Sequence, residues 1–293
     1  MCSLTELFCL IDDFCKEFEP AWNKRLLNDG EKKRERATGL ALSEIMTIIV
    51  FFHFMRHRIF KNFYNDFVCA FLRPAFPQLP CYERFVALMP RCSVPLAAFF
   101  EMLKGQCTGW SIADSTAIAV CDNLRIRNHR VFKNAAARGK TSTGWFYGFK
   151  LHTIINHRGE LLSAHLTPGN IDDRKSLKNK ALGLFGKLYA DKGYIGKWLK
   201  DWLSKHRIEL ITKVRKNMKQ PALSDFDKAA LRYRSVIESV FHELKNLCQI
   251  EHTRHRSVTN FCINLLGGII AYCLFPKKPR VPAAETSLCI NGF

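Results

Sequence analysis

The sequence lacks three features that would assign it to other classes of protein. Its 12 cysteines are scattered and form no CxxC pair, so the spacing of a zinc ribbon is missing. The longest apolar run, residues 45–55, has about 11 residues, whereas a membrane-spanning helix needs about 20. The first 20 residues contain no basic start followed by an apolar run. We therefore expect reduced cysteines, no transmembrane segment and no signal peptide, as in a cytoplasmic protein.

Acidic residues are scarce relative to basic ones. The 293 residues include 45 Lys and Arg against 26 Asp and Glu, which gives a formal net charge of +19 and a pI near 9.6. Apolar residues make up 47% of the chain, enough to fill a core, so disorder of the whole chain is excluded. This basic excess indicates a polyanionic partner, for which nucleic acid is the first candidate and a membrane surface the alternative.

The first part of the chain, residues 1–105, has a helical pattern throughout. Helices are expected at 3–19, 41–56, 58–72, 82–89 and 94–104. The second and third of these could form a unit like a helix-turn-helix, or the whole region could serve packing or dimerisation. The sequence therefore predicts an all-α DNA-binding or dimerisation region.

The pattern changes after residue 106 to an alternation of strands and helices. Strands are predicted at 111–120, at 148–169 as a hairpin, at 187–191 and at 208–214, followed by a long helix at 225–248. Three meandering strands followed by alternating elements imply a mixed sheet with helices on its faces. We predict an α/β domain over 106–275 and a basic flexible tail over 276–293.

Three acidic residues lie where a carboxylate is unexpected. Asp114 shares a strand face with Ile112, and Asp191 closes the short strand KLYAD. Glu238 borders the apolar face of the long helix. A buried charge is costly unless it is paired or holds a metal. Each acid also has an ordinary interpretation: a solvated strand face, a helix N-cap, or an i,i+4 pair between Arg234 and Glu238.

Taken together, the three acids suggest metal-assisted phosphoryl chemistry. Two divalent ions about 3.5–4 Å apart can clamp the attacking and leaving oxygens of an in-line displacement. Mg²⁺ prefers carboxylate oxygens, water and substrate phosphate as ligands. We therefore expect two ions of Mg²⁺ or Mn²⁺ at Asp114, Asp191 and Glu238, with Asp173 as a reserve candidate for Asp191.

Several stretches then identify a family resemblance. They include IADSTAIAVCDNLRI, GWFYGFKLHTIINHRGEL, LYADKGYIGK and IEHTRHRSVTNFCINLLGG, in that order. On these stretches the chain resembles the DDE transposases of bacterial insertion sequences, and most of all the insertion-sequence family nine-eight-two. The resemblance implies a ribonuclease H-like catalytic domain, with a mixed five-stranded sheet flanked by helices after an all-α N-terminal region.

The family's two aspartates and its glutamate fall on Asp114, Asp191 and Glu238, which the resemblance makes both catalytic and metal-binding. Many such transposases carry Tyr-x2-Arg-x3-Glu-x6-Lys around the glutamate. Arg234 and Lys245 fit that spacing and would orient phosphates. The Tyr position is occupied by Leu231, which is a departure from the pattern.

The resemblance implies DNA transposition without a covalent enzyme intermediate. Hydrolysis at the ends of the element frees a 3′-OH, which then attacks target DNA. The partners would be the terminal inverted repeats and the target, and the pairing of two ends implies a homodimer or a larger active complex. The alternatives are a metal-dependent endonuclease without strand transfer and a catalytically inactive DNA-binding derivative.

Basic segments are expected to contact the DNA backbone, which positions DNA without reading its sequence. The segment 125–140 contains no acid and follows the first strand, so it is expected beside Asp114. The segment 213–219 leaves a later strand. The predicted DNA-binding residues are Arg125, Arg127, Arg130, Lys133, Arg138, Lys140, Lys213, Arg215, Lys216, Arg234 and Lys245.

Aromatic and histidine residues of the predicted sheet have ordinary interpretations. Trp145, Phe146 and Tyr147 are interpreted as core residues in preference to base-stacking ones. His152 and His165 are interpreted as structural histidines of their strands. Asp172 and Asp173 are expected to cap the helix that follows.

Overall fold

The computed structural model of the chain describes residues 3–28, 39–142, 144–214, 217–218, 222–251 and 255–282. It divides into two compact units. The helical unit comprises residues 1–103 and 244–276, and the sheet unit comprises residues 104–243 and 277–293. The first division falls close to the predicted boundary at 105. Residues 244–276, however, group with the N-terminal helices and not with the sheet.

The helical unit is a bundle around the C-terminal helix of the chain. Its elements are α1 (Leu4–Asn28), α2 (Leu42–Phe54), α3 (Phe60–Asn62), a π-helical turn (Phe63–Val68), α4 (Cys69–Phe71), α5 (Tyr82–Leu88), a 3₁₀ turn (Met89–Cys92), α6 (Ser93–Leu103) and α11 (Val258–Cys273). The predicted helix 58–72 is therefore one helical stretch with a π-helical centre. α11 packs against both α2 and α6.

A buried histidine marks the contact between α2 and α11. His53 is fully buried on α2, and its Nδ1 donates a hydrogen bond to the carbonyl oxygen of Cys248. On α11, Gly267 and Gly268 face the His53 ring, and a Cβ at either position would press on it at 3.2–3.3 Å. The absence of two side chains thus lets the helices approach closely around the imidazole.

One helical stretch, Tyr82–Leu103, is long and apolar enough to cross a membrane by length and composition alone. It consists of α5, the 3₁₀ turn and α6, and Leu96 and Phe99 are among its buried side chains. Core helices pass the same test, so this stretch is weak evidence for a membrane span.

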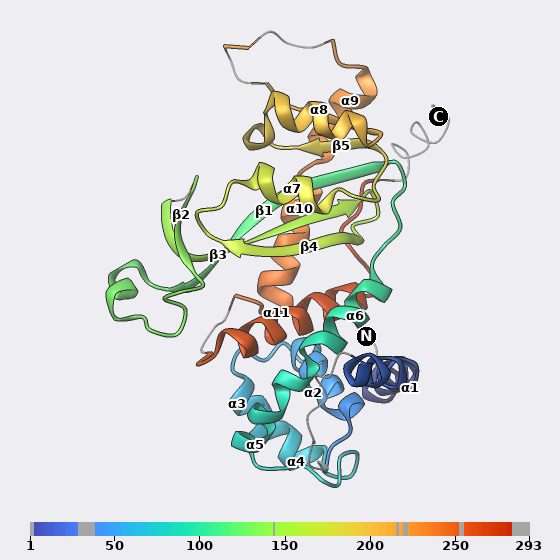
Figure 1. Cartoon of the computed structure of the whole chain (residues 1–293), viewed down its shortest axis with the longest axis vertical. Coiled ribbons are helices and arrows are strands. Elements are labelled where there is room, and N and C mark those ends of the chain that lie inside the picture. Colours follow the sequence, from blue (N-terminus) through green and yellow to red (C-terminus); the bar gives the residue numbers. More distant parts are fainter. Residues whose placement is uncertain are drawn as a thin grey trace. The chain divides into compact units, whose positions relative to one another are not determined.

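The sheet unit carries a mixed sheet. Its strands are β1 (Trp110–Cys121), β2 (Ala137–Thr141), β3 (Gly144–Asn156), β4 (Leu161–Pro168), β5 (Gly186–Ala190) and β6 (Ile208–Thr212). β1 pairs antiparallel with β3 and parallel with β5, β5 pairs parallel with β6, and β4 pairs antiparallel with β3. The order β4-β3-β1-β5-β6 confirms the predicted α/β fold with a mixed sheet, in which Figure 1 labels β1 to β5.

The structure adds a sixth strand to the five predicted. β2 pairs antiparallel with the first residues of β3, from Gly144 to Gly148, while β4 pairs with the remainder of β3. The predicted basic loop 125–140 therefore ends in a strand. The sequence shows no alternation of apolar and polar residues in this strand. Its exposed face carries Arg138 and Lys140, and its buried face carries only Gly139.

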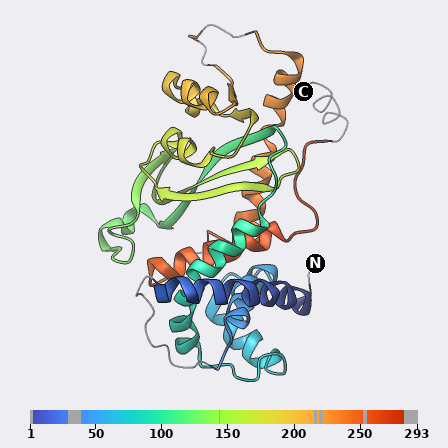
Figure 2. The same cartoon turned by 45° about the vertical axis from the view of Figure 1, so that its right-hand side comes forward.

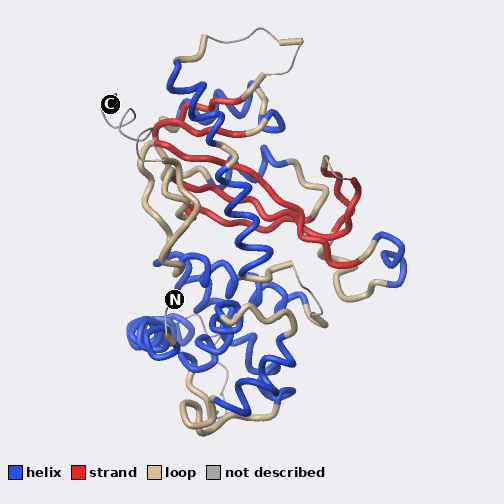
Figure 3. The backbone as a smooth tube through the Cα atoms, turned by 180° about the vertical axis from the view of Figure 1, so that it is seen from behind, coloured by secondary structure: helices blue, strands red, loops and turns tan. Residues whose placement is uncertain are grey.

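Helices cover both faces of the sheet. The helices of the sheet unit are α7 (Asp173–Lys180), α8 (Lys197–Lys205), α9 (Asp225–Tyr233) and α10 (Val236–His242), with 3₁₀ turns at Asn123–Asn128 and Lys192–Tyr194. α7 and α8 share a buried apolar cluster with the sheet through Leu177, Leu199 and Leu203. α10 crosses the opposite face, as the view from behind shows (Figure 3).

The predicted helix 225–248 is divided. α9 ends at Tyr233, Arg234 and Ser235 form a turn, and α10 runs on into a π-helical turn at Glu243–Leu247. α9 is anchored to β5 through the buried Asp227, which accepts hydrogen bonds from Lys187 Nζ and the Tyr189 hydroxyl, each at 2.8 Å. The anchor fixes α9 on β5 seven residues before Arg234.

Part of the predicted flexible tail is ordered. Val281 is buried, and its N–H donates to the carbonyl oxygen of His157 at 2.9 Å. Gly159, in the β3–β4 turn with φ of 74°, contacts the carbonyl oxygen of Pro279 where any Cβ would clash. The segment 277–282 therefore packs on the hairpin, and residues 283–293 lie outside the described residues.

Candidate active site

The register of the sheet brings two of the three predicted acids together. Ala113 of β1 pairs with Ala190 of β5 in a parallel arrangement, so the next residue of each strand is an aspartate. Asp114 continues β1, whereas Asp191 leaves the sheet and begins the 3₁₀ turn. The Asp191 side chain makes no capping hydrogen bond to that turn, so the ordinary interpretation as an N-cap does not apply.

The third acid comes from the helix that crosses β1. α10 contacts β1, and Glu238 lies in its first turn, four residues after Arg234. Arg234 lies between α9 and α10 with a helical backbone conformation, so it keeps the i,i+4 spacing to Glu238. Its guanidinium also reaches the edge of the sheet where both aspartates lie.

Arg234 contacts all three predicted acids. Its Nη1 donates to Oδ2 of Asp114 at 2.7 Å, and its Nη2 lies 3.9 Å from Oδ1 of Asp191 and 3.6 Å from Oε1 of Glu238. The guanidinium is 18% exposed, so solvent screens these pairs only partly. Three carboxylates from β1, the end of β5 and α10 are thus gathered around one cation.

The three carboxylates differ in their environments. The Asp114 side chain is 21% exposed, against 52% for Asp191 and 63% for Glu238. Burial raises the pKa of Asp114 to about 6, although the N–H of Ser115 and the Arg234 guanidinium both favour its charged form. Asp191 adds to the rise by repulsion between like charges. A further cation beside Asp114 would be favoured for the same reason.

The three carboxylates are chemically suited to bind a divalent cation. Carboxylate oxygens are the hard ligands that Mg²⁺ and Mn²⁺ prefer. Among the residues that the structure describes, no group of three or more His, Cys, Asp or Glu side chains is close enough to form a ready metal site. The Arg234 guanidinium, within 4 Å of each of the three carboxylates, supplies positive charge at this point.

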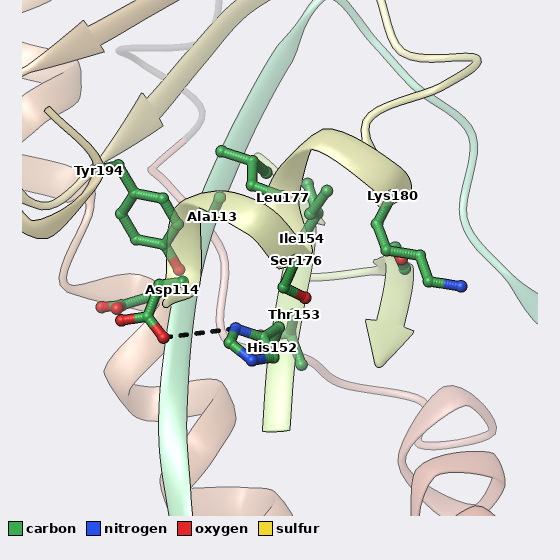
Figure 4. Close-up of a pocket in the computed structure, with 11 residues that line it drawn as sticks. Ala113, Asp114, His152, Thr153, Ile154, Ser176, Leu177, Lys180 and Tyr194 are labelled. Atoms are coloured by element: carbon green, nitrogen blue, oxygen red, sulfur yellow. Dashed lines mark ion pairs between the residues drawn. The ribbon is translucent and has the colours of Figure 1, made fainter. Parts of the chain in front are cut away.

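A small cavity adjoins Asp114 on the side of α7 (Figure 4). Its volume of about 10 Å³ lies at the lower limit of what can hold a single water. Its lining includes three buried polar atoms without a hydrogen-bond partner: Nδ1 of His152, Oγ1 of Thr153 and Oγ of Ser176. Buried polar groups of this kind are normally satisfied, so the cavity is suited to hold an ordered water.

Asp173 belongs to this cavity. Asp172 caps α7 by accepting from the N–H of Arg174, which confirms its predicted role, and leaves Asp173 at the first helical position. Its Oδ1 accepts from Lys150 Nζ at 3.0 Å and lies 3.7 Å from Nδ1 of His152. His152 Nε2 is within 2.8 Å of the Thr167 hydroxyl. Burial lowers the pKa of His152 to about 4, so this imidazole is neutral at pH 7.

The sequence did not reveal that Tyr194 belongs to the same region. It is 97% buried between β5 and α8, lines the cavity beside Asp114, and its hydroxyl lies close to Ser115. Burial raises the pKa of its hydroxyl well above the ordinary value. The only sequence signal is its place three residues after Asp191, which becomes informative once the 3₁₀ turn is known.

The predicted DNA-binding residues are distributed over several elements. Arg125, Arg127, Arg130, Lys133, Arg138 and Lys140 are all exposed between β1 and β3, and Lys213 is exposed just after β6. Arg215 and Lys216 lie outside the described residues. Lys245 belongs to the helical unit, where its Nζ lies 3.1 Å from Oε1 of Glu251.

The segment 125–140 does not lie beside Asp114 as predicted. β1 has 12 residues, and Asp114 is only the fifth, so the strand continues for seven residues to Cys121 before the basic segment begins. At about 3.3 Å per residue this places the start of the segment roughly 23 Å along the strand from Asp114. The expectation failed because the alternating stretch SIADSTAIAV does not show how long the strand continues beyond the acid.

Comparison with known proteins agrees with this geometry. A family model described as "Transposase DDE domain" matches residues 104–258, which is just over half of the chain. The chain belongs to this family of transposases, enzymes that cleave and join DNA strands and generally depend on divalent metal. The matched range includes all of β1 to α10, and therefore the three carboxylates and Arg234.

Other comparisons are distant. A cryo-EM structure of the piggyBac transposase synaptic complex with hairpin DNA is similar to this chain with a TM-score of 0.48 and 12% sequence identity. That similarity covers 93% of this chain and 73% of the other. No curated protein matches the sequence.

Proposed function

We propose that Asp114, Asp191 and Glu238 are the catalytic carboxylates of this transposase and hold two divalent cations, Mg²⁺ or Mn²⁺. The observation that carries the proposal is their common contact with one guanidinium, at 2.7, 3.9 and 3.6 Å. Three acids from separate elements thus concentrate negative charge at one point, which is what a site for divalent cations requires.

The positions of the three residues suggest separate roles. Asp114 pairs with Thr153 of β3, directly follows Ala113, which pairs with β5, and is largely buried, so it would provide the fixed ligand. Asp191 and Glu238 are more exposed and can adapt to substrate. When bound, divalent cations would supply the positive charge that stabilises the attacking and leaving oxygens of a phosphodiester. Arg234 is placed to donate hydrogen bonds to a phosphate oxygen at the same point.

The reaction proposed is strand cleavage at the ends of an insertion sequence, followed by transfer of the freed 3′-OH to target DNA. The DNA partners would be the terminal inverted repeats and the target. Because two ends have to be brought together, we propose a homodimer or larger complex. The helical unit would serve DNA binding or dimerisation. The protein would act in the cytoplasm at the nucleoid, as a member of the insertion-sequence family nine-eight-two.

Incubation with an oligonucleotide carrying the element's end and a supercoiled plasmid tests this proposal. In Mg²⁺ the wild-type protein should nick the end and produce joined plasmid products. Asp114→Asn should abolish both, while Asp225→Asn should leave both intact, because Asp225 is exposed on α9 and pairs only locally with Lys228. Nicks without joined products would favour an endonuclease, and specific binding without nicks a DNA-binding derivative.

A further inference from the structure

A basic arm projects from the sheet unit at the far end of β1. We define the arm as residues 122–141 together with the start of β3, and the cartoons show its loop standing clear of the sheet (Figures 1 and 2). Apart from Asp122, which caps the 3₁₀ turn, the arm contains no Asp or Glu, and the next acidic residue is Glu160, so the net charge of the arm is strongly positive. The arm is too far from Asp114 to contribute to the strand-cleavage site, so its function has to be considered separately.

Trp145 is the most unusual side chain of the arm. It is 52% exposed, whereas its neighbours Phe146 and Tyr147 are buried, so its interpretation as a core residue is wrong. It lies on β3 directly opposite Lys140 of β2. With half its surface exposed while its neighbours bury their rings, the indole is accessible to a partner.

Two cations flank the exposed indole. The guanidinium carbon of Arg138 lies 4.9 Å from the Trp145 ring centroid, and Lys140 Nζ lies 5.6 Å from it. Both residues are exposed on the same face of β2. An exposed aromatic ring with two cations beside it combines the two groups that bind a nucleotide, since the ring can stack on a base and the cations can pair with its phosphates.

The platform is held in place by its backbone. Gly139 lies between Arg138 and Lys140 and pairs with Phe146 of β3, and a Cβ there would come within 2.3 Å of the Gly169 carbonyl oxygen and 2.7 Å of the Phe146 ring. The amide Nδ2 of Asn123 donates to the carbonyl oxygen of Trp145 at 2.7 Å. The adjacent Leu124 is 93% exposed, which adds a second apolar side chain to the arm. Such a rigid surface loses little conformational entropy when a ligand binds.

We propose that Trp145, with Arg138 and Lys140, forms a stacking platform for an unpaired base of the bound DNA. The proposal rests on the proposed function in that the DNA is the substrate of this transposase. The positive charge of the arm favours a polyanion such as DNA over an uncharged, apolar partner. A base inside a duplex has no open face for the indole, so the ligand is a base that is flipped out or lies in a single-stranded end.

Equilibrium binding in EDTA tests the platform independently of catalysis. The probes are a fully paired duplex, the same duplex with one bulged base, and the same duplex with a short single-stranded overhang. The wild-type protein should bind at least one of the probes with unpaired bases more tightly than the paired one. Trp145→Ala should remove that preference, with a loss of roughly 5- to 100-fold on the preferred probe and little change on the paired duplex.

Matched variants separate stacking from charge and from folding. Trp145→Phe should retain most of the preference, because phenylalanine also presents a ring. Arg138→Gln with Lys140→Gln should weaken binding to all probes. The proposal is overturned if the wild-type protein shows no preference, or if Trp145→Ala weakens all probes equally or none. Because no metal is present, this result stands apart from the cleavage assay, whose failure would instead refute the proposed function.

Discussion

Arg234 donates a hydrogen bond to Asp114 at 2.7 Å although 120 residues separate the two in sequence. The same guanidinium approaches Asp191 and Glu238, so all three acids share one arginine. The arrangement places a protein cation where this family is expected to hold metal. Binding of divalent cations and the contacts of Arg234 should therefore be in competition.

Removal of that guanidinium should destabilise the metal-free protein. Arg234→Gln leaves Asp114 largely buried beside Asp191 without a neutralising charge, so we expect the free energy of unfolding in EDTA to fall by about 1–3 kcal/mol. Mn²⁺ should then raise the melting temperature of the variant more than that of the wild-type protein, because the variant has no internal competitor. Thermal unfolding with and without Mn²⁺ measures both effects.

Arg232→Gln is the matched control, because Arg232 is exposed on α9 only two residues away. It should change neither the stability in EDTA nor the response to Mn²⁺. Equal responses to Mn²⁺ in all three proteins would show that Arg234 does not compete with metal.

The anchor of α9 provides a second prediction. Asp227 is buried and accepts hydrogen bonds from Lys187, Tyr189 and the Ser224 hydroxyl. Although burial alone would raise it, these contacts hold the pKa of Asp227 below the ordinary value. Asp227→Ala should lower the free energy of unfolding by about 1–3 kcal/mol, and should also reduce DNA cleavage, because Arg234 follows directly after this helix.

The control for this anchor is Asp225→Ala, whose carboxylate is 98% exposed and pairs with Lys228. Its effect on denaturant unfolding should be less than about 0.5 kcal/mol. If both variants were equally stable and equally active, Asp227 would have no part in positioning Arg234.

Acid should destabilise the helical unit through His53. Burial lowers the pKa of His53 to about 4, while an unfolded histidine titrates near 6.5. The unfolded state therefore binds more protons in this range, and stability falls as the pH decreases from about 6.5 to about 4. Between pH 7 and pH 5 the contribution of His53 is on the order of 1–2 kcal/mol.

His53→Gln, whose amide can still donate to the Cys248 carbonyl, should lose less stability between pH 7 and pH 5 than the wild-type protein. Thermal unfolding at the two values measures the difference. Part of the acid sensitivity should remain, because burial also lowers the pKa of His152 and His255 to about 4. An unchanged acid sensitivity in the variant would indicate that His53 is already charged in the folded protein.

The basic arm should determine much of the salt dependence of DNA binding. Arg125→Gln with Arg127→Gln removes two exposed charges from its 3₁₀ turn. If both contact phosphates, the slope of log K against log salt should become less steep by roughly 2. Lys16→Gln removes an exposed charge that pairs with Asp12 at 2.8 Å on α1, and should leave the slope unchanged. Identical slopes for all three proteins would remove the arm from the DNA interface.

Much of the fold could be predicted because its signals are local. Alternation in SIADSTAIAV and the hairpin turn at Gly159 indicated β1, β3 and β4, and Asp191 could be placed at the end of β5 from the short apolar stretch before it. Local sequence signals do not show which elements pair in the tertiary structure. β2 is defined by its pairing with β3, and the position of α9 by its anchor on β5.

The candidate site was predictable in part for the same reason. The two aspartates could be brought together because neighbouring parallel strands share an edge, but the central place of Arg234 depends on a turn that no propensity indicated. Trp145 was misassigned because an apolar residue in a strand is usually buried, and only the pairing with an exposed β2 places it outside. Asp173 and His152 required the packing of α7 on the sheet.

The most direct test of the central claim is the location of manganese in crystals of the wild-type protein soaked in Mn²⁺. Anomalous density should lie within bonding distance of carboxylate oxygens from Asp114, Asp191 and Glu238, with the Arg234 guanidinium displaced from between them. Manganese bound only at other side chains, with the Arg234 contacts intact and DNA still cleaved, would contradict the account.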